Sequence, residues 1–233
     1  MKVEILEREL RELGGVRPPR GFVGRVLSAA GIGERYAELE TVIGTFFVSW
    51  NRAGVTAVGR ERPAHAEKVA KLPGQIRFDL TGLTDFERAV LHKTLEIPRG
   101  EVRTYSWVAR EIGRPRAVRA VGTALANNPI PILIPCHRVV RSDGVIGNYG
   151  AGGPEAKFRI LDHEGARPDR LLELARRRTR LVGSRTTKVF CLPSCHAARR
   201  IRPENEVPFA DESAARSAGY RPGLHCRPAE IAS

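Results

Sequence analysis

The first sixty residues carry two kinds of apolar spacing. Residues 1–35 have the periodicity of two short helices, and residues 41–60 change to the alternation of a β-hairpin. The sequence Asn-Arg-Ala-Gly at residues 51–54 supplies the hairpin turn. We expect the aromatic side chains of this segment to lie in a core rather than to form a binding platform: Phe46, Phe47 and Trp50.

The next apolar segments predict a helical region. A helix is expected to begin at Thr84, because Glu87 follows three residues later and completes a capping box. Residues 100–126 predict two helices joined by a tight turn, since Gly113 is suited to end the first and Pro115 to begin the second.

The second helix of this pair, residues 116–126, is made largely of small residues. It can therefore approach another backbone closely, and it places Arg116 and Arg119 on one face, three residues apart. This pattern suits a helix that lies in a groove of DNA. It equally suits a helix packed in the core with its arginines in solvent, and the residues alone leave both interpretations open.

A cysteine and a histidine stand side by side at the end of an apolar run. Residues 132–135 are Ile-Leu-Ile-Pro, and Cys136 and His137 follow. A buried thiol is usually inert because burial raises its pKa, and a reactive one needs a partner that favours the thiolate. The pair is therefore either a core cysteine beside a hydrogen-bonded histidine or a nucleophile beside its base.

The segments after the cysteine predict a loop and two helices. Residues 144–153 are rich in glycine and contain Tyr149, so we expect a mobile loop with one aromatic side chain. Residues 157–165 and residues 171–180 predict helices. The second ends in the basic run 176–180, which is either a solvated linker or a contact for phosphates.

Composition adds charge to this picture. The 233 residues include 39 Lys and Arg against 26 Asp and Glu, which gives a net charge of +13. This balance favours a polyanionic partner, although a basic enzyme unrelated to nucleic acid has the same property. Four cysteines are too few for a disulfide scaffold, no apolar run reaches the length of a membrane span, and we find no signal peptide. We therefore expect a cytoplasmic protein.

Several short motifs identify a family when they are taken together. In chain order they are FDLTGLT at 78–84, IPRGEV at 97–102, RAVG at 119–122, NNP at 127–129, IPCHRV at 134–139, GNY at 147–149 and HEG at 163–165. With this order and spacing, residues 78–166 resemble the catalytic domain of the O6-alkylguanine-DNA alkyltransferases. The segment GAGG at 150–153 has one residue more than the family pattern, which affects the shape of the loop.

This resemblance implies a single-turnover transfer of an alkyl group from O6 of guanine to the protein. Cys136 corresponds to the acceptor, His137 to the base that takes the thiol proton through a water, and Glu164 to the carboxylate that orients the base. Asn128 corresponds to a residue that bridges the turn and the active-site segment, and Tyr105 to the phenol that protonates N3 of guanine. No cofactor is implied for this step.

The resemblance also implies a partner, double-stranded DNA that contains an O6-alkylguanine. The target nucleotide must leave the stack to be reached. Arg119 corresponds to the side chain that takes its place while the second helix lies in the minor groove. The other residues implied at the DNA surface are Thr104, Ala117, Ala120 and Gly122. The residues implied at the substrate pocket are Val139, Asn148 and Tyr149.

A second resemblance lies in the tail, which is similar to the zinc-binding module of the bacterial Ada proteins. That module holds zinc with four cysteines, and the first of them accepts a methyl group from a DNA phosphotriester. Cys191, Cys195 and Cys226 correspond to three of the four. Gly223 stands at the remaining position, although a tetrahedral site needs a fourth donor. The candidates for that donor are His225, His196 and a water molecule.

Three interpretations of the tail stay open. It is a working phosphotriester acceptor, a structural zinc knuckle, or a metal-free remnant. The tail covers only part of the usual module, and it follows the alkyltransferase segment, whereas the module precedes that segment in the Ada proteins.

Together these features predict an α/β (α+β) protein with four parts. They are N-terminal helices with a small ribonuclease-H-like subdomain (1–77), a helical alkyltransferase domain that contains a helix-turn-helix (78–166), a basic linker helix (167–184) and a partial zinc module (185–233). The expected function is DNA repair by a monomer. The alternatives are a non-catalytic protein that binds alkylated bases, which the presence of Cys136 argues against, and a methylation-sensing regulator that uses the tail.

Overall fold

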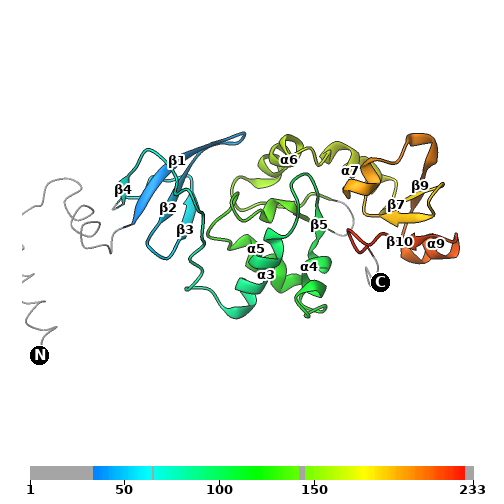
Figure 1. Cartoon of the computed structure of the whole chain (residues 1–233), viewed down its shortest axis with the longest axis horizontal. Helices are drawn as coiled ribbons and strands as arrows, with labels where there is room; N and C mark the ends of the chain where they lie inside the picture. The colour runs from blue at the N-terminus through cyan, green and yellow to red at the C-terminus, as the bar shows by residue number, and fades with distance from the viewer. Residues whose placement is uncertain (1–33, 65, 142–144, 229–233) are drawn as a thin grey trace, which may run out of the picture.

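A computed structural model of the chain describes residues 34–64, 66–141 and 145–228. These residues form three parts in a row: a β-sheet, a group of helices, and a second β-sheet with short helices (Figure 1). The helices expected over residues 1–35 lie outside the described residues except at the last two positions, and Arg35 already begins a strand.

The first part is a four-stranded sheet of order β3-β2-β1-β4. Its strands are β1 (Arg35–Thr41), β2 (Gly44–Trp50), β3 (Val55–Gly59) and β4 (Glu67–Lys68). The predicted turn after β2 is confirmed, because the Asn51 side-chain oxygen accepts the backbone N–H groups of Ala53 and Gly54. Phe46 and Trp50 are buried in the core as expected, whereas Phe47 is half-buried.

The second part contains the predicted pair of helices. Its first three helices are α3 (Asp85–Leu95), α4 (Tyr105–Glu111) and α5 (Val118–Ala126). The capping box predicted at the start of α3 is present, with Thr84 and Glu87 bonded reciprocally. Gly113 follows α4 with a positive φ of 72°, which favours glycine. Helix α5 begins two residues later than Arg116, because Ala117 closes a turn onto the carbonyl of Arg114.

The cysteine segment lies between α5 and the next long helix. It forms the short helix η1 (Cys136–Arg138) and then β6 (Val139–Val140), which pairs in parallel with β5 (Arg103–Thr104). Two helices follow, α6 (Gly153–His163) and α7 (Pro168–Arg176). The predicted basic linker helix is therefore wrong in its extent, since the helix ends at Arg176 and the rest of the basic run leads into a strand.

The third part is the tail, and it has a sheet and a core of its own. Its strands are β7 (Leu181–Ser184), β8 (Val189–Cys191), β9 (Glu206–Phe209) and β10 (Arg221–Pro222), in the order β10-β8-β7-β9. The short helices are α8 (His196–Arg199), η2 (Pro203–Asn205) and α9 (Glu212–Ser217). Phe190, Phe209 and Tyr220 pack in its core. Strand β7 belongs to this sheet, so the tail begins before residue 185.

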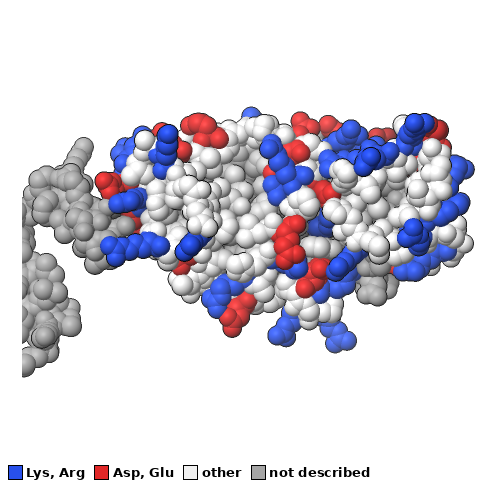
Figure 2. All heavy atoms as spheres, in the orientation of Figure 1, with Lys and Arg blue, Asp and Glu red and all other residues white. Residues whose placement is uncertain are grey.

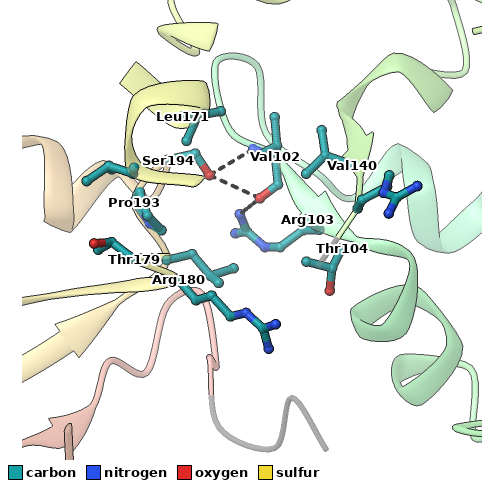
Figure 3. Close-up of a pocket in the computed structure, with 12 residues that line it drawn as sticks. Val102, Arg103, Thr104, Val140, Leu171, Thr179, Arg180, Pro193 and Ser194 are labelled. Carbon is teal, nitrogen blue, oxygen red and sulfur yellow. Dashed lines mark hydrogen bonds between the residues drawn. The ribbon is translucent and has the colours of Figure 1, made fainter. Parts of the chain in front are cut away.

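The tail is docked against the helical part. Ser194 accepts the backbone N–H of Val102 and donates to the carbonyl of the same residue, at 3.1 Å each (Figure 3). The apolar seam beside this contact includes Val140, Leu171 and Leu192. Within the described residues, no helix is long and apolar enough to cross a membrane.

Replacement of Ser194 tests this seam. Ser194→Ala leaves the buried N–H of Val102 without its partner and removes one of the two hydrogen bonds to the Val102 carbonyl, so we expect the free energy of unfolding to fall by about 1–3 kcal/mol. Urea denaturation followed by circular dichroism measures the change. Ser213→Ala, at an exposed position of α9, is the control and should alter stability by less than about 0.5 kcal/mol.

Candidate active site and metal centre

Cys136 begins η1 and is almost fully enclosed, with 7% of its surface exposed. The Asn128 amide donates to the Cys136 sulfur at 3.2 Å and to the carbonyl of Ile134 at 3.1 Å. Its oxygen accepts the backbone N–H of Ile130 at 3.0 Å. One side chain at the end of α5 therefore fixes both the thiol and the segment that leads to it, which is the bridging role expected of Asn128.

The neighbour of the cysteine, His137, is held by a carboxylate. His137 Nε2 lies 3.2 Å from Glu164 Oε1, and its other ring nitrogen, Nδ1, is buried without a hydrogen-bond partner among the described residues. Arg138 also donates to both oxygens of Glu164, at 2.7 and 2.9 Å. Burial lowers the pKa of His137, and Glu164 opposes this effect. The lowered pKa favours the neutral imidazole, the form that can accept a proton.

The Glu164 carboxylate is ionised. Burial favours its neutral form, but the hydrogen bonds and charges of His137 and Arg138 outweigh this effect and lower its pKa to about 2. Arg138 continues to the carbonyl of Ile97 at 2.7 Å, so the same network reaches the residues after α3.

Burial raises the pKa of the Cys136 thiol, and several groups act against this rise. The largest opposing effects are the hydrogen bond from Asn128 and the positive charge of Lys157, and the backbone of Cys136 and His137 adds to them. Lys157 lies on α6, is 1% exposed, and donates to the carbonyls of Val139 at 2.6 Å and Asn148 at 3.3 Å. Burial lowers the pKa of Lys157 to about 8, so the side chain is still charged at neutral pH.

A cavity of about 630 Å³ opens beside the cysteine. Its lining comes from the end of α5, the cysteine segment, the glycine loop and the first sheet, and includes Phe46, Val58, Arg60, Asn128, Cys136 and Tyr149. Arg60 stacks over the Phe46 ring at 4.6 Å and donates to the carbonyls of Ile43 and Ala151. The first sheet therefore supplies one wall of the cavity and holds the glycine loop in place.

Two tyrosines flank the cysteine network. Tyr149 lines the cavity and meets the His137 ring edge to face, with 6.0 Å between centroids. Tyr105 begins α4, and burial together with the nearby Cys136 raises the pKa of its phenol. A phenol that keeps its proton suits the donor role expected of Tyr105. The other two residues expected in the pocket, Val139 and Asn148, contact Lys157 through their carbonyls.

The residues expected at a DNA surface divide into three groups. Arg119 and Ala120 are exposed on α5, next to the exposed Arg116. Ala117 and Gly122 are half-buried, and a Cβ at Gly122 would lie 4.0 Å from the Tyr105 ring, an ordinary contact distance. Thr104 is buried, and its hydroxyl caps α4 at the N–H of Trp107.

Three residues of the site escaped the sequence analysis: Arg60, Arg138 and Lys157. Lys157 left a signal, because it stands three and four residues before Ile160 and Leu161 and so shares the buried face of α6. Arg138 and Arg60 left none, since their partners are distant in the sequence.

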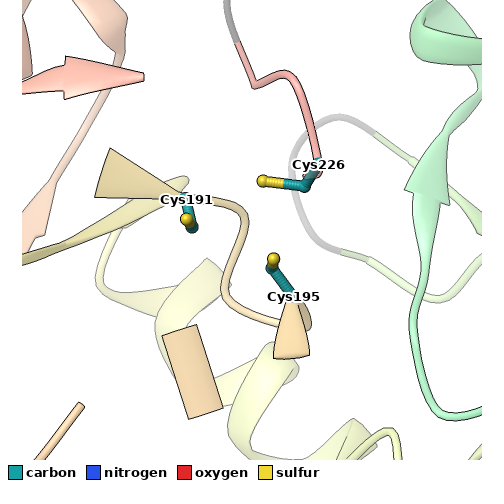
Figure 4. A group of neighbouring side chains, drawn as sticks. All are labelled: Cys191, Cys195 and Cys226. Carbon is teal, nitrogen blue, oxygen red and sulfur yellow. The ribbon is translucent and has the colours of Figure 1, made fainter. Parts of the chain in front are cut away.

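The predicted metal ligands converge in the tail. The sulfur atoms of Cys191, Cys195 and Cys226 lie within 4.8 Å of one another, and Figure 4 shows them directed into one space. All three residues are buried. The Gly223 backbone is pressed against them, since a Cβ at that position would lie 2.5 Å from the Cys191 sulfur. Three thiols in this arrangement fit a soft divalent cation such as zinc, with one ligand still to be named.

The two candidate histidines differ in their surroundings. His225 Nε2 lies 3.2 Å from Glu101 Oε1, in the helical part. The His196 side chain is exposed, and its backbone N–H donates to the same carboxylate oxygen at 2.8 Å. Only His225 of the two is grouped with a cysteine among the described residues that can hold a metal.

Comparisons with known proteins agree with both parts of this site. The family described as "6-O-methylguanine DNA methyltransferase, DNA binding domain" matches residues 85–166. The family described as "metal binding domain of Ada" matches residues 177–229. The second range includes all of β7, in agreement with the tail sheet of the structure.

Individual relatives point to the same family. The methylated-DNA–protein-cysteine methyltransferase of Rattus norvegicus is 54% identical over 81 residues, which are 34% of this chain and 39% of that protein. The chain thus spans less than half the length of this relative.

Solved structures match a larger share of the chain. The crystal structure of the Mycobacterium tuberculosis O6-methylguanine methyltransferase is 29% identical with a TM-score of 0.50, and covers 57% of this chain and 94% of its own. The structure of M. tuberculosis OGT in complex with DNA is 28% identical with a TM-score of 0.50, and covers 59% and 99%. The chain therefore contains one segment, residues 85–166, that matches the DNA-binding domain of the 6-O-methylguanine DNA methyltransferases, and a second, residues 177–229, that matches the metal-binding domain of Ada.

Proposed function

We propose that the protein repairs DNA by moving the alkyl group of O6-alkylguanine to Cys136, once per molecule. The observation that carries this proposal is the enclosed thiol at the edge of a cavity, bonded to Asn128 and adjacent to the His137–Glu164 pair. The names of the rat relative and of the M. tuberculosis structure, with the complex of OGT and DNA, support it.

The reaction needs no cofactor in this scheme. The Cys136 thiol gives its proton to His137, and the resulting sulfur anion attacks the alkyl carbon. The S–C bond forms as the C–O6 bond breaks, and the guanine leaves with the electron pair while Tyr105 protonates N3. Glu164 holds the imidazolium that forms. The thioether product keeps its alkyl group, so the protein is consumed.

Entry of the base requires that it leave the duplex. Cys136 is 7% exposed and lies below the surface, and a stacked guanine does not reach it. We infer that the exposed Arg119 of α5 enters the stack in place of the target base, and that the small residues around it allow close approach to the minor groove.

We further propose that the protein acts as a monomer in the cytoplasm and that its first sheet is the ribonuclease-H-like subdomain.

The tail supports a second candidate function, acceptance of a methyl group from a DNA phosphotriester at Cys191. A hollow of about 640 Å³ reaches this cysteine and is lined by Arg200, Arg202 and Arg221. Lys and Arg side chains also gather over the tail on the face seen in Figure 2. Such a surface suits a phosphate backbone.

Alkylation of a single cysteine is the first expected outcome. After incubation with a duplex that contains O6-methylguanine, mass spectrometry should find one added methyl group on the Cys136 peptide. Cys136→Ala should lose this product and keep its affinity for DNA, because the side chain is buried away from the surface. Cys191→Ala is the matched control and should still be methylated at Cys136. DNA with methylphosphotriesters tests Cys191 in the same assay, and a wild-type protein without any adduct on Cys136 would contradict the proposed repair reaction.

Arg119→Ala should slow transfer from duplex DNA and spare transfer from free O6-benzylguanine. The stacked base costs a few kcal/mol to extrude, so we expect a loss of at least about tenfold with the duplex. Arg116→Ala removes the same charge just before α5 and should have a smaller effect. Single-turnover rates with the two substrates measure the difference. An equal loss on both substrates would show that Arg119 acts on the fold of the site rather than on the base stack.

Removal of the Lys157 charge should move the pH dependence of transfer. Lys157→Met takes away a positive charge that lowers the pKa of Cys136, so this pKa should rise and the rate at neutral pH should fall by about tenfold for each unit of rise. The rate should recover as the pH increases, because the thiolate then forms without help. Arg159→Met, at an exposed position of α6, should leave the pH profile unchanged. Rates with free O6-benzylguanine at several pH values provide the test, and identical profiles for wild type and Lys157→Met would exclude this role.

A further inference from the structure

The metal site of the tail lacks a donor at the position of Gly223. Three thiols surround one point, and tetrahedral sites of this kind are closed by a fourth protein ligand. Gly223 has no side chain to offer, and its backbone is so close to Cys191 that a Cβ would lie 2.5 Å from the sulfur. A fourth protein donor must therefore come from another residue.

A second group of metal-binding side chains shares Cys195 with the first. The ligand atoms of Glu101, Cys195 and His225 lie within 4.8 Å of one another. His225 directly precedes Cys226 in the sequence, and its side chain is 56% exposed. Glu101 and His225 are thus the two further candidates for the fourth ligand. The contacts that Glu101 already makes favour His225.

Glu101 is fully engaged in its present place. It is 2% exposed, and its Oε2 bonds to Arg103 at 2.7 Å. Its Oε1 accepts the His196 N–H at 2.8 Å and lies 3.2 Å from His225 Nε2. To bind a metal directly, this oxygen would have to give up those contacts. A buried carboxylate that accepts one ring nitrogen of a histidine is instead the usual support of a metal-binding histidine.

We propose that His225 is the fourth ligand of a Cys3His metal site, and that Glu101 of the helical part orients it. Because Nε2 is bonded to Glu101, Nδ1 is the ring nitrogen left to bind the metal. The site is then built from two parts of the chain, since Glu101 lies 90 residues before the first cysteine ligand. Strand β5, which follows Glu101 closely, pairs with β6, which follows Cys136. Metal binding therefore secures the tail against the part that carries the reactive cysteine.

The test uses the full chain, freed of metal and titrated with Co²⁺, whose absorption spectrum reports the ligand set. Wild type should give the spectrum of a tetrahedral ion with three thiolates and a nitrogen. His225→Ala should change that spectrum and weaken binding of Zn²⁺, measured by competition with a chelator, by about 10–100-fold or more. His196→Ala is the matched control, an exposed histidine next to Cys195, and should change neither.

The role of Glu101 is tested separately. Glu101→Gln should weaken Zn²⁺ binding by about 10–100-fold and leave the cobalt spectrum unaltered, because the ligands stay the same. Ser194→Ala loosens the same seam without touching Glu101, and should lose much less affinity. Circular dichroism confirms that each variant is folded.

Several results would overturn the proposal. They are a His225→Ala protein that binds metal like wild type, a cobalt spectrum that changes in Glu101→Gln but not in His225→Ala, and a wild-type chain that binds no metal at its three cysteines. Transfer of a benzyl group to Cys136, followed in the same samples, reports on the repair reaction independently.

Discussion

The carboxylate of Glu164 is the contact on which the arrangement around Cys136 depends. It stands at the end of α6 and accepts hydrogen bonds from His137 and Arg138, the two residues that follow the cysteine. Arg138 extends the connection to Ile97 after α3. One ionised carboxylate thus connects the cysteine turn to α3 and α6. Its pKa of about 2 means that Glu164 does not change its charge near neutral pH.

Burial of the Cys136 thiol favours its neutral form, and neighbouring residues oppose this effect. Burial keeps water away from the sulfur but raises its pKa, and a neutral thiol is a poor nucleophile. Asn128 and Lys157 act against this rise from opposite ends of the chain segment, one from the end of α5 and one from the middle of α6. Both side chains are buried and hydrogen-bonded, so the electrostatic environment of the thiol is built into the fold.

The sequence allowed local features to be predicted better than contacts between distant segments. The capping box of α3 and the turn after β2 depend on residues a few positions apart. Lys157 was missed although its helical spacing marks it as buried. Glu101 was missed because its partners, Arg103 aside, lie more than ninety residues away. The basic run after α7 was wrongly extended as helix, because pairing with β8 and β9 makes the following residues a strand.

Arg60 and Phe46 form one wall of the cavity beside Cys136. The segment that matches the DNA-binding family begins at residue 85, after the whole first sheet. A protein reduced to that segment would keep the cysteine and its hydrogen-bond network but would have a pocket open on one side. The segment that matches the family model is therefore smaller than the unit that encloses the cavity beside Cys136.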